Sequence, residues 1–165
     1  MTTMRKLPIG IQSFENIRNE NYLYVDKTAL IYQLVTKGKP YFLSRPRRFG
    51  KSLLISTLDA YFQGKKELFK GLAIDQLEQD WNVYPVLHLD LNARKYESEA
   101  DLVAILNQYL EMWEADYGDE MKSRAPEERF FYVIRRAWEQ TGRQVVVLID
   151  EYDKPLLQTI HNEPL

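Results

Sequence analysis

Leu43-Ser44-Arg45-Pro46-Arg47-Arg48-Phe49-Gly50-Lys51-Ser52-Leu53-Leu54 is the stretch around which this chain is organised. An apolar run at residues 40–43 leads into it and predicts a β-strand, and a helical pattern follows it. The core, Gly50-Lys51-Ser52, matches the second half of the phosphate-binding loop G-x-x-x-x-G-K-[ST]. Gly50 lets backbone approach a phosphate without a Cβ in the way. The N–H groups of such a loop and of the helix that follows form a concave anion site.

The loop departs from the general motif at its start. Arg45 stands where the first glycine is expected, and Pro46 removes one N–H donor. The tripeptide alone also fits a basic turn that caps a helix, but the expected strand before it and helix after it favour a phosphate loop. In that interpretation Lys51 reaches the β- and γ-phosphates, and the Ser52 hydroxyl binds Mg²⁺.

A second motif lies a hundred residues later, where residues 145–149 are followed by Asp150 and Glu151. The apolar, mostly β-branched run predicts a strand buried on both faces of a parallel sheet. Open α/β sheets place their ligands at the carboxyl ends of such strands. Asp150 is suited to hold Mg²⁺ and Glu151 to orient or deprotonate a water. The alternative, a strand end with two solvated acids, is disfavoured by the presence of Gly50-Lys51-Ser52.

The arginines of the loop leave alternatives open. Arg47 or Arg48 can contact phosphate, to which a guanidinium is well suited. The arginines can equally be solvated, or pair with acids elsewhere such as Asp75. Nucleic-acid contact is a third interpretation, which a single basic patch supports poorly.

Four segments carry a resemblance to a known family: residues 22–28, 41–52, 60–69 and 148–155. In them the chain resembles the bacterial AAA-ATPase-like family, and the similarity extends from Pro8 onward. The resemblance implies an α/β fold of the P-loop NTPase type, a parallel sheet with flanking helices, in which a loop start such as Arg45 is normal. It implies ATP and Mg²⁺ as cofactors, with Ser52 and Asp150 at the metal and Glu151 as the catalytic residue. The nucleotide-binding residues it implies are Arg47, Arg48, Phe49, Gly50, Lys51, Ser52 and Leu53.

The resemblance also sets an expectation for the domain. In the ATPase class that the chain resembles, a later strand lies between the first and third strands, and the 165 residues stop before one. Residues 1–165 are therefore expected to be the incomplete N-terminal part of the P-loop domain, with a gap between Phe42 and Val147. We expect exposed strand edges, marginal independent stability and association, with further copies of the chain as partners. Nucleic acid is expected only through the nuclease-like C-terminal domain that family members commonly carry.

Composition narrows the class of protein. The 165 residues are 45% hydrophobic and 28% charged, with a net charge of −2, as in a soluble globular domain. That balance gives no global attraction to nucleic acid or acidic lipid. No apolar run approaches the ~20 residues that span a bilayer. The absence of cysteine suits a reducing compartment, so we expect a cytoplasmic protein without membrane contact.

The remaining chain predicts helices and one more strand. Ser13, Asp26 and Ser98 are expected helix caps, and Asp26 has nucleotide contact as its alternative. Residues 86–91 predict a second strand, in which His88 is expected to pack and Asp90 to lie near the site. The helix after Pro126 is expected to bury an apolar face that includes Phe130, Phe131, Val133, Ile134 and Trp138.

The sequence therefore predicts Mg-ATP binding and hydrolysis. One rival is a nucleotide-gated interaction module with negligible turnover, which measured turnover would distinguish. The other is a small-molecule kinase, whose phosphoryl transfer would depend on an added acceptor.

Overall fold

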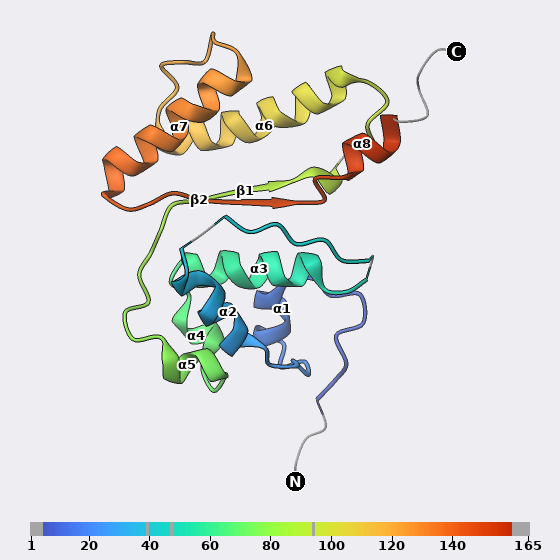
Figure 1. The fold of residues 1–165 in the computed structure, drawn as a ribbon, viewed down its shortest axis with the longest axis vertical. Helices are drawn as coiled ribbons and strands as arrows, with labels where there is room; N and C mark the ends of the chain where they lie inside the picture. The colour runs from blue at the N-terminus through green and yellow to red at the C-terminus, as the bar shows by residue number, and fades with distance from the viewer. Residues whose placement is uncertain (1–4, 39, 47, 94, 160–165) are drawn as a thin grey trace. The chain divides into compact units, whose positions relative to one another are not determined.

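The computed structural model describes residues 5–38, 40–46, 48–93 and 95–159. The chain divides into two compact units, Met1–Val83 and Tyr84–Leu165. The first unit is helical in its described residues, and the second carries two strands with helices (Figure 1). The fold class is therefore mixed α/β.

The first unit packs short helices around one long one. The long helix is α3 (Lys51–Phe62), and the others are α1 (Phe14–Asn19), α2 (Thr28–Thr36), α4 (Lys66–Phe69) and α5 (Ala73–Leu77). Helix α3 ends at a glycine signal, because Gly64 follows its C-cap Gln63 in the left-handed region at φ 68°. A Cβ at Gly64 would lie 2.8 Å from Cγ2 of Val83, so the close approach also requires glycine.

Aromatic rings form the core of this unit. The Phe69 side chain is fully buried, with its ring centroid 4.8 Å from that of Phe14 and 5.1 Å from that of Trp81. The ring of Tyr61 in α3 meets the ring of Phe69 edge-on and that of Trp81 at a tilt. Large buried rings contribute most of the apolar area that stabilises so small a unit.

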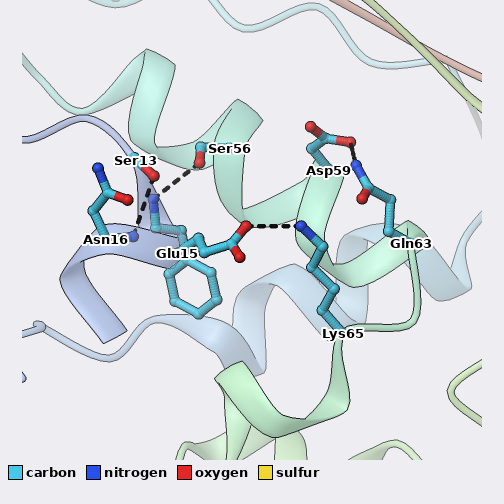
Figure 2. A network of polar contacts seen from close by, with 8 residues as sticks. Ser13, Glu15, Asn16, Ser56, Asp59, Gln63 and Lys65 are labelled. Atoms are coloured by element: carbon cyan, nitrogen blue, oxygen red, sulfur yellow. Dashed lines mark hydrogen bonds and ion pairs between the residues drawn. The ribbon is translucent and has the colours of Figure 1, made fainter. Parts of the chain in front are cut away.

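Polar contacts fasten α1 to α3 (Figure 2). The Phe14 N–H donates to Oγ of Ser56 at 2.9 Å, and Nζ of Lys65 lies 2.7 Å from Oε2 of Glu15. The expected cap at Ser13 is confirmed, because its Oγ accepts the N–H of Asn16 at 3.2 Å. Helix α1, which precedes the loop in the sequence, is thus attached to α3 at Ser56, one turn after Ser52.

The second unit is built on two parallel strands. Strand β1 (Val86–Asp90) pairs with β2 (Val146–Asp150) in a register that sets Val86 beside Val146 and Asp90 beside Asp150. Between them run η1 (Leu91–Ala93), α6 (Glu99–Tyr117) and α7 (Pro126–Thr141), and α8 (Lys154–Thr159) follows. The two long helices lie along one side of the strand pair (Figure 1). Their shared core contains Leu87, Leu110, Trp113 and Val133.

Two expectations about the sheet are wrong. Residues 40–43 form no strand, and in the described part of the chain the sheet consists of β1 and β2. Apolar sequence favours an extended chain, but a strand also needs a neighbour to complete its ladder. Strand β2 is not buried on both faces, since Val147 and Ile149 are 38% and 46% exposed. Leu87, the registered neighbour of Val147, is fully buried in the core shared with α6 and α7, so at this position the helices cover β1 and leave β2 exposed.

The expected apolar face of α7 is also partly wrong. The helix buries Arg129, Val133 and Ala137, which recur every four residues. Phe131 and Trp138 lie off this row and are 72% and 55% exposed. The helix has more large apolar residues than one face can hold, so periodicity alone placed these two wrongly.

A buried ion pair joins α6 to α7. Nε and Nη2 of Arg129 each donate to a carboxylate oxygen of Glu114 at 2.7 Å, and Nη1 donates to Oδ1 of Asn107 at 2.5 Å. Glu114 is 3% exposed and Arg129 5%. The hydrogen bonds to Glu114 raise the pKa of Arg129 against the lowering effect of burial. Such a pair costs desolvation energy and is tolerated because its geometry is bidentate.

Breaking this pair is expected to destabilise the second unit strongly. Arg129→Met leaves the Glu114 carboxylate buried without its partner, which should lower the free energy of unfolding by about 3–5 kcal/mol. The double variant Arg129→Met/Glu114→Leu should recover most of the loss, because no uncompensated charge remains. Urea denaturation measures both, with Arg135→Met on the exposed side of α7 as the control. A single variant as stable as the control would contradict the expectation.

Candidate functional site

The turn that enters α3 contains two residues in the left-handed region. Gly50 lies in the left-handed region at φ 76°, and Arg48 at φ 66°. The first main-chain hydrogen bond of the helix runs from the Leu54 N–H to the Gly50 carbonyl at 3.0 Å. In an α-helix the N–H groups before that bond have no acceptor within the helix. The N–H groups of Lys51, Ser52 and Leu53 are those of the first turn of α3.

The side chains predicted to bind nucleotide surround this turn. Arg45, Arg48 and Phe49 are exposed, with Phe49 at 64%. Lys51, Ser52 and Leu53 are partly buried in the first turn of α3. Arg47 lies outside the described residues.

Asp75, the alternative partner for these arginines, has a local contact. Oδ2 of Asp75 accepts the Gly71 N–H at 3.0 Å. The phosphate contact of Arg48 stays a prediction.

The two expected carboxylates lie at the end of β2. Asp150 is 8% exposed and is registered with Asp90 at the end of β1. The first acid, Asp150, accepts the Glu151 N–H on Oδ1 at 2.9 Å. Glu151 has φ 54°, which places a non-glycine residue in the left-handed region. Such conformations cost about 1–2 kcal/mol and persist where the surroundings hold them.

Asp90 and His88 belong to the neighbouring strand. Oδ1 of Asp90 accepts the Asn92 N–H at 2.8 Å, so the carboxylate is turned to the chain that leaves β1. His88 is partly buried in the middle of β1, beside Leu148 in the register. Its expected packing role stays a prediction.

Asp26 acts at two helix starts. Oδ1 accepts the N–H and the hydroxyl of Thr28 at 2.8 and 2.6 Å, at the first turn of α2. Oδ2 accepts the Ala73 N–H at 2.7 Å, and Oγ1 of Thr28 accepts the Ile74 N–H at 3.1 Å, both at the start of α5. Asp26 therefore accepts N–H groups at both helix starts, one of them 47 residues away, but the N-cap position of α2 is Lys27 and not the expected Asp26. Both carboxylate oxygens are engaged in this role.

Burial raises the pKa of Asp26. The hydrogen bonds from Thr28 and Ala73 and the charge of Arg18 lower it by more, so the pKa lies below its ordinary value. A carboxylate with a lower pKa in the folded state stabilises the fold above its unfolded pKa. That contribution is lost as the pH falls through the folded pKa.

Asp26→Asn is therefore expected to lower the free energy of unfolding at pH 7 by about 1 kcal/mol, because the amide keeps one oxygen acceptor and loses the other, and one hydrogen bond contributes about that much. The gap between this variant and the unsubstituted protein should narrow as the pH falls from about 5 through the lowered pKa of Asp26, because the carboxylate then takes up a proton. Urea denaturation across that range measures it, with Asp116→Asn on α6 as the control. A gap that does not change with pH would contradict the expectation.

The two residues predicted to bind a metal ion have side chains of a type that suits Mg²⁺. The Ser52 hydroxyl and the Asp150 carboxylate are hard oxygen donors, and Mg²⁺ is commonly held by one or two such groups together with phosphates and waters. Among the described residues no group of three or more His, Cys, Asp or Glu side chains is arranged to hold a metal. In that same part of the chain no helix is long and apolar enough to cross a membrane.

Comparison with known proteins gives the family. The model of a family described as "Predicted AAA-ATPase" matches residues 8–165. The chain belongs to this AAA-ATPase-like family. Its members are thereby linked in general to ATP binding and hydrolysis.

A curated relative from Azotobacter chroococcum mcd 1, "Uncharacterized protein in vnfD 5'region", is 43% identical over 158 residues. The match covers 94% of this chain but 30% of that protein, so the chain spans less than a third of the relative's length. No solved structure matches the chain.

Sequence reasoning missed one polar contact near the acidic strand end. Nζ of Lys154 donates to the main-chain oxygen of Asn92 at 2.7 Å and to its Oδ1 at 3.0 Å. Lys154 lies in residues 148–155, which carried part of the resemblance, but nothing in that segment indicates a partner 62 residues away.

Proposed function

We propose that this chain binds Mg-ATP and that Glu151 promotes hydrolysis of the γ-phosphate. The observation that carries the proposal is the left-handed turn at Gly50, which leads into a helix whose first residues are Lys51 and Ser52. A helix start with a left-handed entry presents successive N–H groups to an anion. Membership of the AAA-ATPase-like family supports ATP as that anion.

Each residue has a proposed role. Lys51 binds the β- and γ-phosphates, while Arg47 and Arg48 add cationic donors and Phe49, Gly50 and Leu53 supply the loop and helix backbone. When bound, Mg²⁺ neutralises charge on the phosphates, with Ser52 and Asp150 as its proposed protein ligands. Glu151 accepts a proton from the attacking water or orients it.

The residues proposed to bind phosphate belong to the first unit, and Asp150 and Glu151 belong to the second. Binding alone needs the loop of the first unit, whereas turnover also needs the acids of the second. The two steps therefore call for separate tests.

Binding is tested by thermal unfolding with and without Mg-ATP. A ligand at about 100 times its dissociation constant stabilises the folded state by about 2.7 kcal/mol, which should raise the midpoint by several degrees. Lys51→Ala should lose this shift, because the phosphates lose their ammonium partner. Lys66→Ala, an exposed lysine on α4, is the matched control and should keep it. Equal shifts in both variants would exclude Lys51 as a phosphate ligand.

Turnover is tested by phosphate release from ATP, without any added acceptor. Glu151→Gln should keep the thermal shift and lose at least about 100-fold in kcat, since an amide cannot accept the proton. Turnover equal to that of the unsubstituted protein would remove Glu151 from the mechanism. A shift without any turnover in the unsubstituted protein would instead identify a nucleotide-gated module, and release that depends on an acceptor would identify a kinase.

A further inference from the structure

The turn after β2 is held in an unfavourable backbone conformation at the residue proposed to activate water. Glu151 is left-handed at φ 54°, although it has a Cβ. Two short-range hydrogen bonds flank it: its N–H donates to Oδ1 of Asp150 at 2.9 Å, and its carbonyl accepts the Lys154 N–H at 3.0 Å. Strained residues persist only where neighbouring contacts determine their conformation, and they are frequent at functional sites.

Lys154 also reaches the neighbouring strand. Its Nζ donates to both oxygens of Asn92, at 2.7 and 3.0 Å, just beyond the end of β1. Asn92 is itself tied to β1, because its N–H donates to Oδ1 of Asp90 at 2.8 Å. The contacts form a chain from Glu151 through Lys154 and Asn92 to Asp90. That chain links the carboxyl ends of the two registered strands.

The chemistry of these contacts points to positioning more than to stability. The ammonium–carbonyl bonds are exposed to water, where charged hydrogen bonds contribute little to folding. Holding a lysine side chain in one geometry also costs conformational entropy. What the contacts do supply is geometry, since two acceptors on one residue fix the ammonium and hence the main chain at Lys154. That main chain carries the N–H bonded to the Glu151 carbonyl.

We propose that Lys154 and Asn92 form a latch that positions Glu151, without either residue touching the substrate. The latch holds the turn so that the Glu151 carboxylate stays aimed at the attacking water. This inference rests on the proposed function, because it assigns a role toward that same water. Lys154 is a positioning residue, since it acts through Glu151.

The first test measures the turn itself, without reference to activity. In the full chain labelled with ¹³C and ¹⁵N, the Cα and Cβ shifts of Glu151 report whether its φ is positive. Lys154→Met should move these shifts toward values of an ordinary negative φ, whereas Lys154→Arg, which can still donate to both Asn92 oxygens, should leave them near those of the unsubstituted protein. Lys122→Met, an exposed lysine between α6 and α7, is the matched control. Unmoved Glu151 shifts in Lys154→Met would overturn the latch, whatever the activity.

The second test measures steady-state ATP hydrolysis. Lys154→Met should lower kcat by about 10- to 100-fold, the effect of misplacing a reacting group, and leave the KM for ATP within about twofold. Lys154→Arg should restore most of the loss. Asn92→Ala removes one of the two acceptors and should lower kcat less than Lys154→Met does. The double variant should have the kcat of Lys154→Met alone, because both residues act through one contact.

The outcomes separate the latch from the function on which it rests. If Lys154→Met loses activity and Asn92→Ala does not, or if the losses multiply, Lys154 contacts the nucleotide directly and the latch is wrong. A raised KM with unchanged kcat would likewise overturn it. If the unsubstituted protein shows no turnover above Glu151→Gln, the proposed function fails, and the chemical shifts still decide whether Lys154 holds the turn.

Discussion

Parallel pairing of β1 and β2 is the constraint on which the second unit depends. Parallel strands cannot be joined by a tight turn, so the chain must return along a crossover before the second strand begins. Helices α6 and α7 make that return, and their residues Leu110, Trp113 and Val133 form a core with Leu87 of β1. The same register sets Asp90 beside Asp150. The position of the candidate acids is thus a consequence of how the backbone completes its hydrogen bonds.

In the first unit, side chains that bind the free N–H and C=O groups of helix ends connect segments that are far apart in the sequence. Arg18 of α1 donates to the carbonyls of Leu68 and Lys70 at 2.6 and 2.7 Å, where α4 ends. The carboxylate of Asp26 meets two helix starts, and the Phe14 N–H is satisfied by Ser56 on α3. Short helices leave a large share of their N–H and C=O groups without partners inside the helix. Side chains from distant segments supply those partners here. One of these contacts attaches α1, which precedes the loop, to α3, which follows it.

Both candidate segments contain backbone in the left-handed region at a residue with a side chain, at Arg48 and Glu151. Glycine would adopt this conformation at lower cost. The chain places an arginine and a glutamate there, residues whose charges suit phosphate and water. Local preference and residue chemistry disagree at these two positions, which is the pattern expected where function outweighs stability.

The sequence by itself determined the features that depend on near neighbours. Residues within a few positions of one another account for the cap at Ser13, the helix that follows Gly50, the Pro126 start of α7 and the strands at 86–90 and 146–150. Only the tertiary structure decided that Arg129 pairs with Glu114, that Asp26 accepts an N–H at a helix start 47 residues on, and that Lys154 meets Asn92 across 62 residues. It also decided that residues 40–43 stay out of the sheet and that Phe131 faces outward. The physical reason is that propensity and periodicity act over one or two turns of chain, whereas burial and long-range hydrogen bonding depend on which segments meet.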